Sequence, residues 1–308
     1  MSKKVIITAD DYGYIDLIDT AILGAAKNHR ITTVSAFSNL NKGPLDKKIT
    51  ALKNTNANIG IGLHLTITSG MPLSEPNYLS KEKDGKLYFK SPKNIVLKKI
   101  PLEEVEIELK AQISQMRSIL GNQIDHISCH HNILYLNPDL FDLYIKLAKA
   151  ENLPIRAPRN CISKPKFSPL RNLNPALIPP YIEDAFGVMN ARNIIPALVA
   201  VSENNVKSQE NQLFIENVDS PNFFLIHHYG NQDINIFKTM YDILEENEVC
   251  EQIMHLGRAT VPEDFNDFPN GINKGYLEDR NKEFLLLMSN EFLNLKNGQN
   301  DITFSKYS

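Results

Sequence analysis

Val5-Ile6-Ile7-Thr8-Ala9-Asp10-Asp11 is the stretch that decides the fold. Its first five residues are apolar or β-branched and do not alternate, which is typical of a strand buried on both faces of a parallel sheet. Two carboxylates end the run. Apolar residues then recur at helical spacing over 15–25, and β-branched residues return over 32–37. The chain therefore begins with a predicted βαβ unit.

The alternation of strand and helix continues along the chain. Helical patterns are predicted at 45–52, 102–120, 138–150, 191–217 and 283–295. Strand patterns are predicted at 59–67, 124–129, 155–158, 223–226 and 302–304. Repeated βα units with polar residues at the strand ends favour a parallel sheet, either closed as a barrel or open and doubly wound.

A barrel explains the polar clusters better than an open sheet does. Asp10-Asp11, His64, His130-His131 and His227-His228 follow strands spread over the whole chain. In a barrel the C-terminal end of every strand faces one mouth, whereas an open sheet gathers mainly the strands at its switch point. No segment has linker composition. We therefore predict one (β/α)-barrel domain over 1–308, with loop insertions near 74–100, 160–185 and 258–280 that line or cover the mouth.

Composition limits the partners and the compartment. The 308 residues carry a formal net charge of −3 without a long basic run, so nucleic acid and anionic membranes have little electrostatic support as partners. The apolar run before Asp10 is too short for a signal peptide, and no apolar stretch approaches the roughly 20 residues of a membrane span. Three widely spaced cysteines suit a reducing compartment. We predict a cytoplasmic protein with a small-molecule substrate. The sequence leaves the oligomeric state open; a homodimer is the expectation, because it is the commonest form of soluble oligomer.

Imidazoles and carboxylates at buried strand ends indicate a metal site, because each isolated polar group would cost on the order of a few kcal/mol to desolvate. The adjacent carboxylates Asp10 and Asp11 cannot both ionise freely without a cation or a proton. One can therefore ligate metal while the other acts as a base. An Asp/His/His set is a three-ligand pattern of catalytic zinc and also admits magnesium or manganese. A helix N-cap at Asp10-Asp11 and a structural core histidine at His64 are the alternatives.

Side chains along a strand alternate between its two faces, which limits which residues around His130 can point into the mouth. Only one of His130 and His131 is expected in the mouth, and Cys129 should point away from His130. Because no signature of a cysteine hydrolase surrounds Cys129, we reject it as a ligand or nucleophile. Asp125-His126 is interpreted as a capping pair at the start of a strand, with at most a supporting role behind the ligands.

Several motifs occur together in a characteristic order. They are Thr8-Ala9-Asp10-Asp11-Tyr12-Gly13, Thr32-Thr33 with Asn39, Gly62-Leu63-His64-Leu65 with Gly70 and Pro72, His126-Ile127-Ser128-Cys129-His130-His131, and Arg156-Ala157-Pro158-Arg159. In this order they resemble the YdjC-like proteins, the family of carbohydrate and chitooligosaccharide deacetylases. The resemblance implies a TIM-like (β/α) barrel, distorted or seven-stranded, related to polysaccharide deacetylases. It also implies removal of the acetyl group from an N-acetylated sugar with one divalent metal ion, Mg²⁺ or Zn²⁺.

The resemblance also assigns roles by motif. Asp11, His64 and His130 resemble the metal ligands, and Asp10 resembles the catalytic base. A late histidine would act as general acid or orient the base; His228 matches best, and His227 is an almost equally good alignment.

Contacts to the substrate are inferred from side-chain chemistry. Arg156 and Arg159 suggest contacts to sugar hydroxyls or to a phosphate, because a guanidinium fork matches such oxygens; strand-end salt bridges are the alternative. Tyr12 is a candidate for stacking on a sugar face, with ordinary core packing as its alternative. His131 is the remaining candidate for substrate binding.

One departure from the family stands beside the ligands. Where the family usually has Asp-Ser-His-His-His, this chain has Ser128-Cys129-His130-His131-Asn132, so a supporting carboxylate and a third histidine are missing. Metal affinity or substrate choice is expected to differ accordingly. Two other functions stay open. The same ligand set would serve a phosphoesterase or amidohydrolase of another small molecule, and a non-catalytic sugar-binding barrel is possible, although a binder has no need of a base beside the ligand.

Overall fold

The structure is a computed structural model that describes residues 3–39, 44–90, 100–135, 138–157, 212, 216–225, 233–258 and 274–307. In this part of the chain, seven strands form one sheet in the order β6-β3-β2-β1-β8-β7, with β9 paired to β1. Every pairing in this sheet is parallel. The strands are β1 (Lys3–Tyr12), β2 (Thr33–Ala36), β3 (Gly60–Leu65), β6 (Ile127–Cys129), β7 (Phe223–Leu225), β8 (Val249–Met254) and β9 (Ile302–Phe304).

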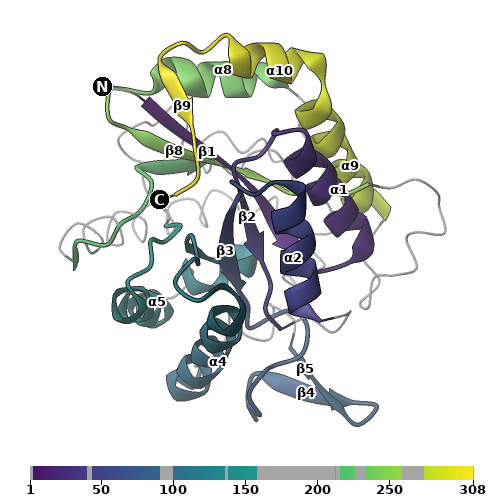
Figure 1. Cartoon of the computed structure of the whole chain (residues 1–308). Helices are drawn as coiled ribbons and strands as arrows, with labels where there is room; N and C mark the ends of the chain where they lie inside the picture. The colour runs from purple at the N-terminus through teal and green to yellow at the C-terminus, as the bar shows by residue number, and fades with distance from the viewer. Residues whose placement is uncertain are drawn as a thin grey trace, which may run out of the picture.

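Helices lie around the outside of these strands (Figure 1). They are α1 (Asp16–Lys27), α2 (Leu45–Thr55), α4 (Leu102–Leu120), α5 (Pro138–Glu151), α8 (Ile234–Ile243), α9 (Lys274–Met288) and α10 (Asn290–Asn297), together with the short 3₁₀ segment η1 (His130–Tyr135). A parallel half-barrel with helices outside it is the arrangement of a TIM-like (β/α) barrel. The predicted fold class is thereby confirmed.

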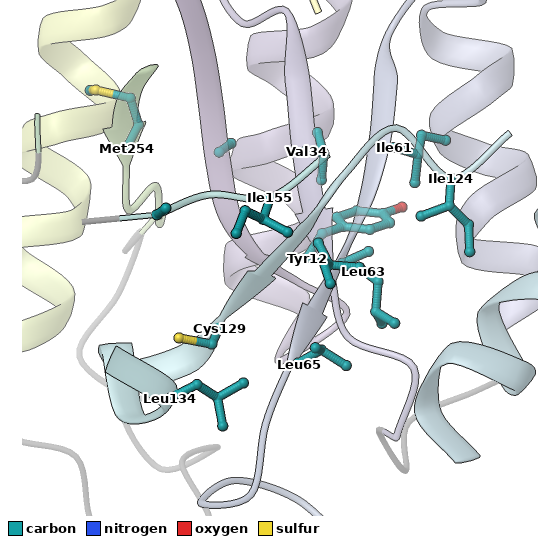
Figure 2. Packing of buried hydrophobic residues seen from close by; sticks show 14 of the residues in the cluster. Tyr12, Val34, Ile61, Leu63, Leu65, Ile124, Cys129, Leu134, Ile155 and Met254 are labelled. Atoms are coloured by element: carbon teal, nitrogen blue, oxygen red, sulfur yellow. The ribbon is translucent and has the colours of Figure 1, made fainter. Parts of the chain in front are cut away.

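Strand β3 shows how the sequence separates the two faces of the sheet. Ile61, Leu63 and Leu65 belong to the hydrophobic core, and Figure 2 shows them along β3 near the ring of Tyr12. The alternate positions on β3 are Gly60, Gly62 and His64, which contact polar side chains instead. The outer face of β3 therefore packs into the core, while its inner face leaves room for polar groups inside the barrel.

Gly62 is required because another residue occupies the space above it. A Cβ at this position would lie 2.2 Å from Cε1 of His126, far inside van der Waals contact. We expect Gly62→Ala to lower the free energy of unfolding by about 1–3 kcal/mol, since the buried imidazole must move. Urea unfolding measures this change.

Gly24→Ala is the matched control for Gly62→Ala. Its Cβ in helix α1 would meet Phe284 at an ordinary 3.7 Å, so this variant should keep or raise stability by up to about 1 kcal/mol. Equal unfolding midpoints for Gly62→Ala and the parent protein would show that His126 does not lie over β3.

The predicted elements agree with the structure to different degrees. The bounds of α4 and β9 match the predictions, and residue 155 forms a single parallel bridge with Ile127. The predicted helix 283–295 is two helices, because Ser289 ends the first and caps α10 by accepting a hydrogen bond from the amide of Phe292. The elements α8 and β8 were not predicted.

The predicted loops differ from the structure in two places. Segment 74–100 contains the antiparallel hairpin of β4 (Ser80–Lys83) and β5 (Lys86–Phe89). Helix α9 begins at Lys274, so the end of the predicted loop 258–280 is helical. The loop 160–185 and most of the predicted helical segment 191–217 lie outside the described residues.

No helix in the described ranges combines the length and apolar character needed to cross a bilayer. The cytoplasmic location and the homodimer stay predictions.

Candidate metal centre

Asp10 and Asp11 both turn into the barrel mouth at the end of β1. Adjacent side chains of a regular strand point to opposite faces. Here Asp11 has a φ of 71°, and the register between β1 and β2 shifts between Ala9 and Tyr12. This bulge re-aims the backbone, so that both buried carboxylates lie within 4 Å of an imidazole nitrogen of His64. The geometry therefore allows one carboxylate of the pair to ligate a metal ion while the other acts as a base.

Asp11, His64 and His130 come together as the residues predicted to bind metal. Their ligand atoms all lie within 4.8 Å of one another. Asp11 Oδ1 lies 3.0 Å from Nδ1 of His130 and 3.4 Å from Nε2 of His64. This buried oxygen nevertheless accepts no hydrogen bond in acceptable geometry. A buried acceptor that faces two imidazole nitrogens without a hydrogen bond is an environment that a divalent cation completes, so the three residues fit a metal ion.

The pKa shifts of Asp11 and His130 suit metal binding. Burial alone would raise the pKa of Asp11, but the Arg280 guanidinium and the imidazoles of His130 and His64 together outweigh it, and the pKa lies well below its usual range. Arg280 comes from α9 and donates a hydrogen bond to Oδ2 of Asp11. Burial lowers the pKa of His130. An ionised carboxylate and neutral imidazoles are the forms that ligate metal ions.

Asp10 is held by a buried ion-pair cluster. Its two oxygens accept hydrogen bonds of 2.6 and 2.8 Å from the guanidinium of Arg156. The same guanidinium donates to both oxygens of Glu251, at 3.0 and 2.8 Å. Burial alone would raise the pKa of Asp10, but Arg156, with its charge and its hydrogen bonds, and the nearby imidazoles of His64 and His255 together outweigh it, so the pKa is lowered. Asp10 is therefore an ionised, rigidly oriented carboxylate beside the three candidate ligands.

His255 completes the mouth and was missed by the sequence analysis. It follows β8, and its Nε2 lies 4.0 Å from Oδ2 of Asp10. Burial lowers the pKa of His255 to about 4. Its backbone amide donates to Glu283 on α9 at 2.7 Å, and burial raises the pKa of that carboxyl to about 8. The strand escaped prediction because Glu251 and Gln252 interrupt its apolar pattern, although a histidine after a six-residue strand was an available signal.

The two histidines after β6 lie side by side. Residues His131 and Asn132 have positive φ values of 56° and 53°, so strand alternation does not apply to them. The ring of His131 lies 3.8 Å from that of His130, and its Nδ1 lies 2.9 Å from the hydroxyl of Thr68. Of the two imidazoles, only that of His130 belongs to the group of candidate metal ligands in the described residues, so the expectation that one of them enters the mouth stays a prediction.

Two of the candidates for substrate binding are engaged elsewhere. Arg156 is 1% exposed and bonds Asp10 and Glu251, which is the salt-bridge alternative considered for it. Tyr12 belongs to the hydrophobic core, and its hydroxyl donates to the carbonyl of Lys48 at 2.9 Å, which is the packing alternative. Arg159, His227 and His228 lie outside the described residues.

Cys129 packs away from the centre. Figure 2 shows its sulfur beside Leu134, among the core residues. Burial raises the pKa of its thiol to about 12, so the nucleophilic thiolate is disfavoured. Both observations agree with its rejection as a ligand or nucleophile.

Comparisons with known proteins give a consistent family. A model of the family of YdjC-like proteins matches residues 4–297. A carbohydrate deacetylase of Thermoanaerobacter pseudethanolicus is 28% identical over 155 residues, which cover 50% of this chain and 60% of that protein. A chitooligosaccharide deacetylase of Escherichia fergusonii is 26% identical over 163 residues, covering 53% of this chain and 62% of that protein. The matches thus span less than two thirds of these relatives.

A solved structure resembles the whole chain. It is a crystal structure from Enterococcus faecalis V583 of a protein proposed to cleave cellobiose phosphate. The TM-score is 0.67 at 20% sequence identity, over 100% of this chain and 98% of the other. At this identity the likeness supports the shared fold alone.

Proposed function

Because the chain belongs to the family of YdjC-like proteins and places Asp10 beside Asp11, His64 and His130, we propose that it is a metal-dependent hydrolase that removes the acetyl group from an N-acetylated sugar. Relatives named carbohydrate deacetylase and chitooligosaccharide deacetylase support this substrate class. The observation that carries the proposal is the second carboxylate, Asp10, held by Arg156 next to the candidate ligands. A protein that only binds sugar would gain nothing from it.

Asp11, His64 and His130 would hold one divalent ion, Mg²⁺ or Zn²⁺. When bound, such an ion polarises the acetyl carbonyl and lowers the pKa of water. Two imidazoles and one carboxylate suit zinc, while the carboxylate also admits magnesium.

In this proposal, Asp10 accepts a proton from the attacking water. Arg156 fixes both of its oxygens, so the carboxylate needs no reorientation when the proton moves. His255, neutral because burial lowers its pKa, lies 4.0 Å from Asp10 and can receive that proton and pass it to the leaving amine. We propose His255 for this step alongside His228 and His227, which the sequence suggested. His131, next to His130, remains our candidate for contacting the sugar.

Acetate release from N,N′-diacetylchitobiose and from its 6-phosphate tests the proposal. Metal-stripped protein should release no acetate, and separate addition of Mg²⁺, Zn²⁺, Mn²⁺ or Co²⁺ should restore release with at least one ion. Asp11→Asn is the informative variant, because asparagine tolerates the left-handed backbone of this position while losing the ligand charge. It should bind metal more weakly and lose activity.

Two results would contradict the proposed reaction. Hydrolysis of phosphate esters without acetate release would favour a phosphoesterase. Metal bound stoichiometrically with no product from any acetylated sugar would favour a binding protein.

A further inference from the structure

A chain of hydrogen bonds runs inside the sheet from His64 to Asp125. Nδ1 of His64 lies 2.8 Å from the hydroxyl of Ser128, which donates to the hydroxyl of Ser35 at 3.1 Å. The Ser35 oxygen lies 2.9 Å from Nε2 of His126, and Nδ1 of His126 lies 3.3 Å from Oδ2 of Asp125. All five residues are at most 4% exposed. We call this series the Asp125–His64 chain.

The protons of the Asp125–His64 chain can be assigned from its carboxylate end. Burial alone would raise the pKa of Asp125, but His126 and the hydrogen bonds from Thr33 and the Tyr307 amide together outweigh it and the pKa is lowered, so the carboxylate is an acceptor. His126 then donates from Nδ1, and its Nε2 accepts from the hydroxyl of Ser35. Ser35 must in turn accept from Ser128, and Ser128 must accept from Nδ1–H of His64. Nε2 of His64 is left with its lone pair, on the side of Asp11.

The surrounding backbone is shaped to hold this chain. A Cβ at Gly60 would lie 2.5 Å from Oδ2 of Asp125, just as one at Gly62 would collide with His126. On the other side, the ring of Tyr307 stacks on His126 at 4.2 Å, and the Tyr307 amide donates to Asp125 at 3.4 Å. The C-terminal segment and the two glycines of β3 thus confine both residues to one position.

We propose that Asp125 and His126 are positioning residues for His64, which hold its Nδ1 protonated through Ser35 and Ser128 and so leave Nε2 as the metal-binding atom. This inference rests on the proposed metal site. Histidine ligands commonly donate their second nitrogen directly to a carboxylate or carbonyl group, and loss of that partner costs about 10–100-fold in metal affinity or activity. In this protein the second nitrogen of His64 bonds the hydroxyl of Ser128 instead, and the carboxylate, Asp125, lies at the far end of the hydrogen-bond chain. The pair Asp125-His126 therefore does more than cap a strand.

The tautomer of His64 in metal-free protein is the first test, read from long-range ¹H–¹⁵N correlations of the imidazoles and assigned with His64→Gln. We expect the Nδ1–H tautomer in the parent protein. Ser128→Ala should shift His64 toward the Nε2–H tautomer, because Nδ1–H then loses its acceptor while Nε2 still lies 3.4 Å from the anionic Oδ1 of Asp11. Cys129→Ala is the matched control: it removes one atom from the next buried residue of β6, on the opposite face, and should leave the spectrum unchanged. An Nε2–H tautomer in the parent protein, or no change in Ser128→Ala, overturns the proposal.

Metal affinity is the second test, measured by chelator competition. Ser35→Ala and His126→Phe should each weaken metal binding about 10-fold, and the double variant should be no weaker than the worse single one, because a series of bonds is broken only once. Phenylalanine retains the stacking on Tyr307. Losses that multiply in the double variant would indicate separate packing defects and overturn the proposal. If His126→Phe does not fold, Ser35→Ala and its His64 tautomer decide the question.

The two proposals can fail separately. A parent protein that binds no metal refutes the metal-dependent hydrolase, whereas the tautomer of His64 still decides whether the Asp125–His64 chain sets its protonation.

Discussion

Asp10→Asn is expected to lower the rate of acetate release by about 10²–10⁴-fold while the protein still binds its metal. Asparagine has nearly the shape of aspartate but is not a base, so it cannot take a proton from water. Asp11, His64 and His130 keep their charges and positions in this variant, and Arg156 keeps Glu251 as a partner. Metal affinity should therefore change much less than the rate.

The separation of rate from affinity is the decisive measurement for Asp10. Asp11→Asn serves as the comparison, because it should lower both quantities together. If Asp10→Asn retains activity within tenfold of the parent protein, another group accepts the proton and the role of Asp10 must be withdrawn.

Arg156→Met is expected to have the largest effect on stability, a loss of about 3–5 kcal/mol in the free energy of unfolding. The side chain of Arg156 is fully enclosed and is the cation that bonds two buried carboxylates, Asp10 and Glu251. Methionine fills part of the volume but leaves both charges without a cation. The remaining partners of Glu251 are the hydroxyls of Thr8 and Tyr307, which supply hydrogen bonds without compensating its charge.

Arg117→Met is the matched control for this loss. Arg117 bonds Glu151 at 2.7 Å, but both side chains are about 30% exposed. Water can replace that partner, so the cost should be at most about 1 kcal/mol. Urea unfolding of both variants at one pH makes the comparison. Similar midpoints would mean that the cluster around Arg156 contributes no more than a surface ion pair, contrary to its burial.

Local sequence patterns were sufficient to predict the elements whose apolar residues recur with a clear period. Helix α4 has bounds equal to those predicted, because its apolar residues recur at helical spacing over 19 residues. Strand β8 was not predicted, because two buried polar residues, Glu251 and Gln252, lie in the middle of it. Their burial depends on Arg156 and on the hydroxyl of Tyr241, which are supplied by other segments. A pattern that assumes apolar residues inside cannot anticipate such partners.

The sequence by itself determined the alternation of strands and helices, and the residue types that meet at the metal centre. Asp11, His64 and His130 each lie one residue from the end of a strand, and parallel strands of a barrel bring such ends together. Only the tertiary structure decided how these residues are oriented and held. The left-handed backbone at Asp11 turns two carboxylates into one mouth, and Arg156 reaches Asp10 across 146 positions of the chain. A buried charge requires a partner inside the barrel, and that partner can come from a distant segment of the chain. Sequence periodicity indicates only which face of an element is apolar, so it does not predict such pairs.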